Sequence, residues 1–428
     1  MSGPPYHVLV FPGGTEIGLE VQRSLAHLKE VELSGAGSAA DAHGPFAYRR
    51  WATVPDVSEP GWQDALAAVI DELGADFVYP GHDEVLVALA ERRDELGARV
   101  VAPSVETCRI TRSKRATYAA LAGVVPVPRV HDDVPAADEY PVFVKPDRGQ
   151  GSQGARLAHD ADDVRRAARD GADLVMTYLP GQEYTVDCFS DREQGVLFAR
   201  GRRRIRTRAG ISMASRSEGD QAAFGRMAED IGRRLGMHGA WFFQVREAAD
   251  GTPTLLEVAP RVAGTMAVHR VLGVNFPLLS LYEHARVPVQ ITPIEADVLL
   301  DRALTNRYRH DLRYSAVYVD LDDTLVVRGE VNTRLAPFLF QCLNERRRLV
   351  LITRHASDLQ ATLGRHRLGG LWDEVVHITD GAEKADHIRE PDAILVDDSF
   401  RERRVARERL GIATFDSSMV ELLIDDRA

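Results

Sequence analysis

The chain has 428 residues, of which 44% are hydrophobic and 27% charged. Its length predicts about three structural units, because a single hydrophobic core stops growing beyond about 300 residues. The formal net charge of −11 argues against a general nucleic-acid binder, and neither a basic leader nor an apolar stretch of bilayer-spanning length occurs, so we expect a cytoplasmic protein without a nucleic-acid or membrane partner.

A strand, a glycine turn and an amphipathic helix open the chain in the stretch YHVLVFPGGTEIGLEVQRSLAHL. Strands and helices continue to alternate to about residue 105, which predicts a doubly wound α/β domain over residues 1–105. The turn at Gly13 and Gly14 lacks a full G-x-G-x-x-G pattern. A tight strand-to-helix connection is therefore at least as well supported as a dinucleotide site.

Longer strands mixed with helices follow over residues 106–291, among them EYTVDCFS, AWFFQVREA and PTLLEVAPR. Such runs with few crossover helices predict an α+β domain built on antiparallel sheet. Residues 292–314 are expected to form a connector, and residues 315–428 return to the alternating α/β pattern. The three cysteines are odd in number and far apart, which predicts buried free thiols rather than a disulfide framework or a zinc site.

A strand that ends in Lys145 leads into a glycine-rich loop within VFVKPDRGQGSQGARLA, residues 142–158. Glycine has no side chain to obstruct the backbone N–H groups, so such a loop can close over phosphates. A plain glycine-rich hairpin is the alternative interpretation. The loop residues that carry the phosphate interpretation are Gly149, Gly151, Ser152 and Gly154.

Three further motifs accompany this loop: RSKRATYAALA before it, and MTYLPGQEYTVDCF and LLEVAPRVAGT after it. With them, roughly residues 5–290 resemble the ATP-grasp ligases, in particular the branch of biotin carboxylase and the carbamoyl-phosphate synthetase large subunit. The resemblance implies a pre-ATP-grasp α/β domain over residues 1–105 and an ATP-grasp fold over residues 106–291. It also implies an ADP-forming carboxylate–amine ligase with ATP as a substrate and Mg²⁺ as the metal, Mn²⁺ being the alternative.

The resemblance implies roles for the residues around the nucleotide. Lys114 and Lys145 would neutralise the phosphates, and the loop from Gly149 to Gly154 would close over them. Glu183, in GQEYTV, would accept hydrogen bonds from the ribose hydroxyls.

The resemblance also implies a metal site and an acceptor site. Gln244 and Glu257 would hold magnesium through hard oxygen ligands, and Arg261 would face the acyl phosphate or the carboxylate being activated. Two positions depart from the family pattern. Ala259 stands where E-x-N-P-R has asparagine, which removes a ligand of the second magnesium, and Thr177 stands where a glutamate often precedes the hinge tyrosine.

The stretch RGRRRIRTR concentrates arginines on one expected strand. Side chains alternate between the faces of a strand, so Arg202, Arg204, Arg206 and Arg208 should share one face and Arg203 the other. An edge strand protected by charge is one interpretation. The other interpretation is that one or two of these arginines bind an anionic substrate, because this strand borders the nucleotide and acceptor cleft in the resembled family.

A second chemistry is indicated by VYVDLDDTLVV, where a short apolar strand runs into Asp320 and Asp322. Two carboxylates two residues apart at a strand end point the same way, an arrangement that suits magnesium-assisted phosphoryl transfer. The alternative is a metal-free helix cap, because Asp323 and Thr324 are good capping residues.

Three later motifs favour phosphoryl transfer: RLVLITRH, GAEKADHI and DAILVDDSF. Their order after D-x-D-x-T resembles the haloacid dehalogenase superfamily of phosphatases, over about residues 315–428. The resemblance implies that Asp320 is the nucleophile and Asp322 the general acid and base, both within the magnesium site. It also implies that Thr353 and Lys384 hold the phosphoryl group, and that Asp397 and Asp398 complete the magnesium shell.

The spacing of these motifs leaves room for little more than one helix in each interval, so the expected third domain has a Rossmann-like, capless form. The whole chain is predicted to be a bifunctional enzyme, a ligase for small-molecule carboxylate and amine substrates fused to a phosphatase, with one substrate phosphorylated. A nucleotide-binding unit that only regulates the phosphatase, and a C-terminal unit that only binds phosphate, are the alternatives. Relatives of the ligase part commonly pair, which leaves a homodimer open.

Overall fold

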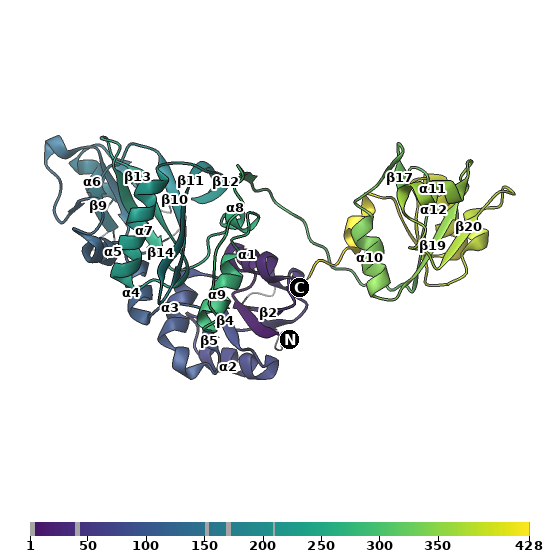
Figure 1. Cartoon of the computed structure of the whole chain (residues 1–428), viewed down its shortest axis with the longest axis horizontal. Helices are drawn as coiled ribbons and strands as arrows, with labels where there is room; N and C mark the ends of the chain where they lie inside the picture. The colour runs from purple at the N-terminus through teal and green to yellow at the C-terminus, as the bar shows by residue number, and fades with distance from the viewer. Residues whose placement is uncertain (1–4, 39–42, 150–153, 168–172, 209, 428) are drawn as a thin grey trace. The chain divides into compact units, whose positions relative to one another are not determined.

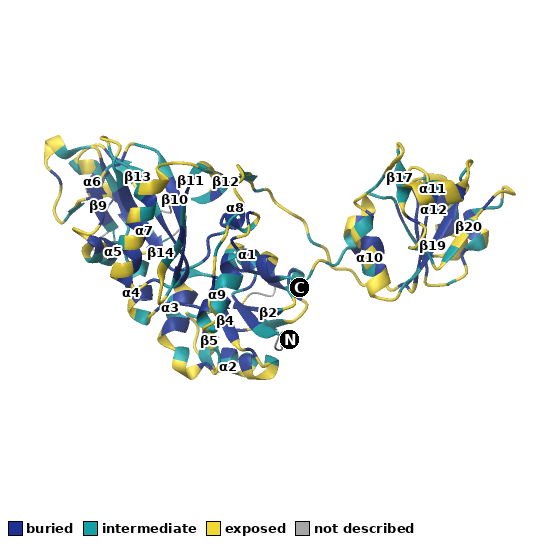
Figure 2. Cartoon of the chain, in the orientation of Figure 1, coloured by how far each residue is buried: buried dark blue, intermediate teal, exposed yellow. Residues whose placement is uncertain are grey.

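The computed structural model describes residues 5–38, 43–149, 154–167, 173–208 and 210–427. The chain forms two compact units that divide after Leu304, and the second runs from Thr305 to Asp426 (Figure 1). Within each unit the central strands are largely buried, while the helices expose one face to solvent (Figure 2). None of the described helices is long and apolar enough to cross a membrane.

A parallel sheet in the order β3-β2-β1-β4-β5 opens the first unit. Residues of β1 alternate between its two faces, with Leu9 packed in a cluster that includes α2 and α3, and Val8 in a cluster that includes α1. Both faces are thus covered, as the prediction of a doubly wound fold requires. The elements are β1 (Tyr6–Phe11), α1 (Glu16–Leu25), β2 (Val31–Gly37), η1 (Gly44–Phe46), β3 (Trp51–Thr53), α2 (Trp62–Leu73), β4 (Phe77–Pro80), α3 (Asp83–Glu91), η2 (Arg93–Glu95) and β5 (Arg99–Val100).

Antiparallel sheets dominate the rest of the first unit, as predicted for the α+β region. A six-stranded sheet has the order β14-β13-β10-β11-β12-β15, and a four-stranded sheet the order β6-β9-β7-β8. Their strands are β6 (Val130–His131), β7 (Val142–Pro146), β8 (Arg156–Ala158), β9 (Asp173–Thr177), β10 (Glu183–Asp191), β11 (Gly195–Arg208), β12 (Ile211–Ser217), β13 (Gly239–Glu247), β14 (Pro253–Ala259) and β15 (Leu299–Asp301). The accompanying helices are α4 (Val105–Arg112), α5 (Lys114–Leu121), η3 (Ala137–Glu139), α6 (Ala161–Ala167), α7 (Gln221–Leu235), α8 (Ala267–Arg270) and α9 (Phe276–His284).

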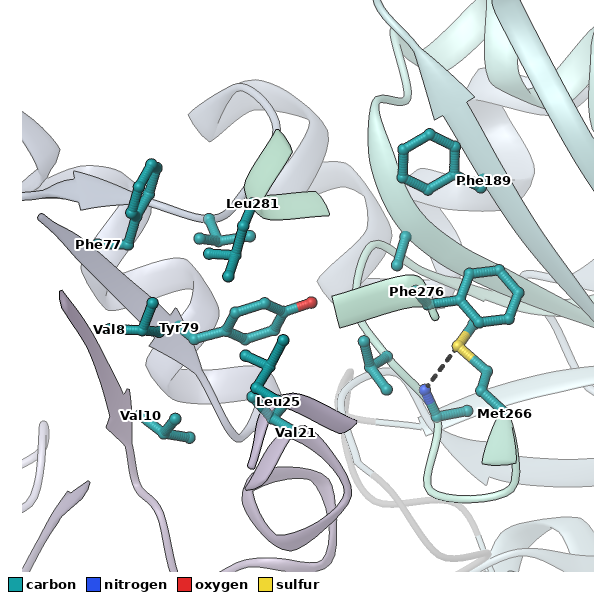
Figure 3. Close-up of a cluster of buried hydrophobic side chains, with 14 of the residues drawn as sticks. Val8, Val10, Val21, Leu25, Phe77, Tyr79, Phe189, Met266, Phe276 and Leu281 are labelled. Carbon is teal, nitrogen blue, oxygen red and sulfur yellow. Dashed lines mark hydrogen bonds between the residues drawn. The ribbon is translucent and has the colours of Figure 1, made fainter. Parts of the chain in front are cut away.

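One hydrophobic cluster joins the parallel sheet to the six-stranded sheet. It contains Val8 and Tyr79 from the parallel sheet, Phe189 from β10, and Phe276 and Leu281 from α9 (Figure 3). The boundary expected near residue 105 therefore separates two sheets but not two cores.

The expected connector, residues 292–314, requires a correction. Residues Leu299–Asp301 form β15, which pairs antiparallel with β12 at the edge of the six-stranded sheet. Pairing satisfies backbone groups that an edge strand leaves open, and an ion pair of Arg206 with Asp301 reinforces it. The first part of the segment thus belongs to the first unit.

The second unit contains a parallel sheet in the order β20-β19-β16-β21-β22, whose first strand in the chain begins at Ala316. Its central strand places Val317 and Val319 in one core cluster and Ala316 and Tyr318 in another, so both faces are buried. The elements are β16 (Ala316–Val319), β17 (Val326–Val327), β18 (Glu330–Val331), α10 (Ala336–Asn344), β19 (Arg348–Thr353), α11 (Leu359–His366), β20 (Glu374–His377), η4 (Lys384–His387), β21 (Ile394–Val396), α12 (Phe400–Leu410), β22 (Ala413–Phe415) and η5 (Met419–Leu423).

The prediction of buried free thiols is confirmed, since Cys108, Cys188 and Cys342 are all buried and unpaired. Burial raises the pKa of the Cys108 and Cys342 thiols to about 12, so both stay protonated at neutral pH and are poor nucleophiles.

A buried carboxylate outside the clefts supports the first unit. Glu283 at the end of α9 accepts a hydrogen bond of 2.9 Å from Arg192 Nη2 and lies 3.0 Å from His238 Nδ1. These partners hold the pKa of Glu283 at about 2 despite its burial. His284 next to it is buried, which lowers its pKa to about 3. Because Arg192 already neutralises the carboxylate, the group is a structural ion pair and not an open metal site.

We expect Glu283→Gln to lower the free energy of unfolding of the first unit by about 3 kcal/mol at pH 7, because it leaves Arg192 without its partner charge. The pKa of Glu283 is depressed on folding, so this stabilisation is present above about pH 4.5 and is lost as the pH falls toward about 2. The gap between variant and wild type in calorimetric unfolding should shrink over that interval. Glu193→Gln, which changes an exposed residue on the same turn as Arg192, is the control. A gap of the same size at low pH would contradict the assignment of Glu283 as the stabilising charge.

Candidate functional site

A cleft of about 170 Å³ lies between the four-stranded and the six-stranded sheet. Its lining comes from β7, β9, β10, β11, β13 and β14, so six strands place side chains in one space. Four of the predicted nucleotide and metal residues line it together: Lys145, Glu183, Gln244 and Glu257. Lys114, at the start of α5, lines it as well.

Lys145 is the buried cation of this cleft. Its Nζ donates to Tyr118 Oη at 2.8 Å and to the Leu256 carbonyl at 3.2 Å, and no described carboxylate lies within ion-pair distance of it. Burial, with repulsion from Lys114, lowers its pKa to about 8. Glu257 and Glu183 attract this ammonium without contacting it, and a buried ammonium without a carboxylate in contact is costly, so a bound anion would stabilise it.

Lys114 holds the start of the glycine-rich loop. Its Nζ donates to the carbonyls of Asp147 at 3.2 Å and Gly149 at 3.3 Å, and burial lowers its pKa. Gly149 lines the cleft, and Gly154 has a φ of 74°, a left-handed conformation that glycine adopts without strain. Two residues predicted for phosphate binding, Gly151 and Ser152, lie outside the described residues.

Gln244 and Glu257 face one another across the strand pair β13–β14. Both line the cleft and offer side-chain oxygens, the donor set that Mg²⁺ prefers. Glu183 is not an isolated carboxylate, because Arg204 Nη1 donates to it and also to Gln244 Oε1 at 3.2 Å. The buried Nε of Arg204 has no hydrogen-bond partner among the described residues.

A second cleft, of about 420 Å³, adjoins the first and shares a wall with it that includes Lys114, Arg204, Gln244 and Glu257. Its opposite wall comes from the turns that follow β1 and β4, at the point where the parallel sheet reverses its strand order. Ligands of open α/β sheets commonly bind in that crevice. Arg302, just beyond β15, also lines it.

Arg261 lines the larger cleft but is already paired. Its Nη2 donates to Asp83 Oδ2 at 2.8 Å, its Nε donates to Asp83 Oδ1, and its guanidinium lies 5.1 Å from the centroid of the Phe242 ring. Arg261 holds the pKa of Asp83 below its usual range although burial opposes this. The sequence reasoning did not identify Asp83; the available signal was an acidic residue opening a helix directly after a parallel strand.

The arginine strand differs from strict alternation. The register of β11 against β12 shifts between Arg204 and Arg206, and a bulge re-aims the side chains beyond it. Arg202 is buried, with its Nε 2.6 Å from Asp187 Oδ2, and lines the larger cleft, whereas Arg206 is exposed and pairs with Asp301. The prediction of four arginines on one face is therefore wrong; the two before the bulge reach the clefts.

In the second unit, four predicted residues meet at the carboxyl ends of the strands. Lys384 Nζ lies 2.5 Å from Asp320 Oδ1 and 2.6 Å from Asp397 Oδ2. Asp320, Asp397 and Asp398 each place a ligand oxygen within 4.8 Å of the others. Burial is the main cause that raises the pKa of Asp320 to about 6, and it also raises the pKa of Asp397. Crowded, buried carboxylates of this kind fit a divalent cation.

Thr353 and Asp322 lie beside this group in different ways. Thr353 is fully buried at the end of β19, and its Oγ1 accepts from the backbone N–H of His355 at 3.1 Å. The Asp322 side chain is 51% exposed and lies 2.9 Å from His355 Nδ1. His355 is the last residue of RLVLITRH, but the sequence predicted no role for it, because the motif order assigns a role only to Thr353 in that stretch.

Comparison with known proteins identifies the fold of the first unit. Residues 171–302 match a family described as ATP-grasp in the biosynthetic pathway with Ter operon, a range that includes β15 and Arg302. The biotin carboxylase domain of Hydrogenobacter thermophilus 2-oxoglutarate carboxylase is 15% identical, with 70% of this chain and 74% of that chain covered and a TM-score of 0.58. No curated protein sequence matches the chain.

Two other solved structures show the same fold relationship. N5-carboxyaminoimidazole ribonucleotide synthetase is 13% identical, with 70% of this chain and 81% of that chain covered and a TM-score of 0.56. An L-amino acid ligase from Bacillus licheniformis is 19% identical, with 68% and 76% covered and a TM-score of 0.53. The ATP-grasp fold predicted for the first unit is confirmed. The resemblance of the second unit to haloacid dehalogenase phosphatases stays a prediction.

Proposed function

We propose that the first unit is a cytoplasmic, ADP-forming carboxylate–amine ligase that uses ATP with Mg²⁺. The observation that carries this proposal is the shared wall of the two clefts, which would place a nucleotide and an acceptor on either side of Glu257. The fold neighbours support it, since one is an amino acid ligase and another was determined with ADP and its magnesium salt. The biotin carboxylase domain is described as a dimer, and a homodimer is proposed here too.

The residues of the smaller cleft fit these groups. Lys145 is a buried cation that lacks a described carboxylate partner, as a phosphate-binding lysine would before its ligand arrives. Gln244 and Glu257 supply paired oxygens that would hold Mg²⁺. When bound, the metal would neutralise charge on the phosphates.

The proposed reaction has two steps. A carboxylate oxygen of the acceptor attacks the γ-phosphorus, the bond from phosphorus to the ADP oxygen breaks, and an acyl phosphate forms. The amine nitrogen then attacks the acyl carbon, phosphate leaves with the bonding electron pair, and the amine loses a proton to solvent. Lys145 and Lys114 offset charge on the phosphates, and the arginines of the larger cleft would orient the acceptor.

A regulatory nucleotide-binding unit is the second candidate for the first unit, and Ala259 favours it because one expected magnesium ligand is missing. ADP release on addition of candidate carboxylates and amines separates the two. Release that depends on both co-substrates supports the ligase, whereas nucleotide binding without any such release supports regulation.

We also propose that the second unit is a Mg²⁺-dependent phosphatase, an assignment carried by the contacts of Lys384 with Asp320 and Asp397. An oxygen of Asp320 attacks phosphorus, the ester P–O bond breaks, and the leaving oxygen takes a proton from Asp322. Water then attacks phosphorus, gives its proton to Asp322 and releases phosphate, which restores the Asp320 carboxylate. A module that only binds phosphate has no physical need for Asp322, so hydrolysis is the better supported function.

The two activities are proposed to act on one phosphorylated compound, a ligase substrate whose product the phosphatase strips. A capless phosphatase cannot select a small molecule by enclosing it. The covalent link between the two units keeps the effective concentration of the phosphatase near the ligase high. Cleaving the chain near residue 310, a few residues into the second compact unit, should preserve turnover of a generic ester but lower the preference for the ligase product by about 10-fold or more. Equal discrimination by the severed piece would contradict a shared substrate.

A further inference from the structure

The side chain that contacts the proposed proton-transferring carboxylate of the second unit is His355, for which the sequence motifs predict no role. The Asp322 side chain is about half exposed, at 51%, and an exposed carboxylate on a loop samples several rotamers. In the structure both its oxygens lie close to one ring nitrogen, His355 Nδ1, at 2.9 and 3.0 Å. A single side chain from the loop after β19 thus restrains Asp322.

His355 is itself held on three sides. Its Nε2 lies 2.9 Å from Thr362 Oγ1 on α11, its backbone N–H donates to Thr353 Oγ1 at 3.1 Å, and its carbonyl lies 2.8 Å from His377 Nε2. The imidazole side chain is only 12% exposed. These contacts connect Asp322 to the strand end that carries Thr353 and to α11, so the ring has one orientation from which Nδ1 reaches the carboxylate.

We propose that His355 is a positioning residue of the phosphatase, which orients Asp322 for proton transfer to the leaving group; the inference rests on the proposed phosphatase function. An Nδ1–H donor suits both states that Asp322 passes through. It donates to the carbonyl oxygen of the protonated acid, leaving the O–H for the leaving group, and it donates to the carboxylate after the proton has gone. In a unit without a cap, this hydrogen bond replaces part of the restraint that an enclosing domain would supply.

Leaving-group dependence tests this role, because proton donation matters little for a phenolate that departs unaided and much for an alkoxide. The first turnover isolates this step, because Asp322 also acts as base in the later hydrolysis that both esters share. We expect His355→Ala in the full chain with Mg²⁺ to leave first-turnover release of 4-nitrophenolate from 4-nitrophenyl phosphate within about twofold of the wild-type rate and to lower first-turnover alcohol release from an alkyl phosphate by about 10-fold or more. His355→Asn should restore most of the difference, because its amide nitrogen can occupy the place of Nδ1, whereas His355→Gln should not.

Binding provides a readout apart from turnover. Beryllofluoride with Mg²⁺ should bind His355→Ala as tightly as the wild-type protein, since the histidine does not contact Asp320 in the structure. His366→Ala, on the same α11, is the control and should behave as wild type with both esters. Equal first-turnover losses on both esters, or a failure of asparagine to rescue, would overturn the positioning role alone. Absence of any turnover by the wild-type protein would overturn the phosphatase assignment and this role with it.

Discussion

Replacing Glu257 with alanine is expected to lower ADP formation by about 100-fold or more. Loss of a residue that only hydrogen-bonds a metal ligand costs about 10- to 100-fold in activity, and loss of the ligand itself should cost more. Glu257 belongs to the wall shared by both clefts and faces Gln244 across β13–β14. Its charge also attracts Lys114 and Lys145. A coupled assay of ADP release, with the acceptor pair identified by screening, measures the effect.

Two comparisons make this result specific. Glu257→Gln keeps the shape of the side chain and should share most of the loss. Glu218→Gln removes an exposed charge just after β12, where Glu218 pairs with Arg203 of β11, and should change little. Hydrolysis of a phosphate monoester should stay close to wild type in all three variants, because the second unit is a separate compact body. Loss of both activities in a folded variant would contradict two independent sites.

Asp320→Asn is expected to lower phosphate monoester hydrolysis by several orders of magnitude, about 10⁴-fold or more, as removal of a nucleophile does in other enzymes. The amide is similar in size to the carboxylate but cannot attack phosphorus. The substitution also removes one of the two carboxylate charges within 2.6 Å of Lys384 Nζ. Release of inorganic phosphate from 4-nitrophenyl phosphate measures the loss, and the variant should no longer bind beryllofluoride with Mg²⁺.

Asp323→Asn is the matched control for this variant. Asp323 lies three residues from Asp320, is exposed, and has a φ of 57°, a left-handed conformation that asparagine tolerates well. Its replacement should therefore preserve both stability and turnover. Normal hydrolysis by Asp320→Asn would sink the nucleophile assignment, and a loss as large in Asp323→Asn would show that the loop and not the Asp320 carboxylate is responsible.

The local parts of both candidate sites could be predicted from the sequence. In the second unit, Asp320, Thr353 and Asp397 each follow or end an apolar strand, and the carboxyl ends of parallel strands meet at one edge of a sheet. In the first unit, Lys145 and Glu257 lie on strands whose motifs have a fixed order. Local hydrophobic periodicity and motif order were sufficient there, because each residue's place follows from its own strand.

The tertiary structure alone decided the pairings between distant residues. Arg261 binds Asp83 across 178 positions of the chain, His355 reaches Asp322 across 33, and β15 joins the six-stranded sheet from within an expected connector. The bulge between Arg204 and Arg206 likewise redirected a strand that alternation described as regular. A single charged side chain produces no periodic pattern in the sequence from which its partner could be predicted. The partner is determined by proximity in the folded structure and by the need to neutralise charge when both groups are buried.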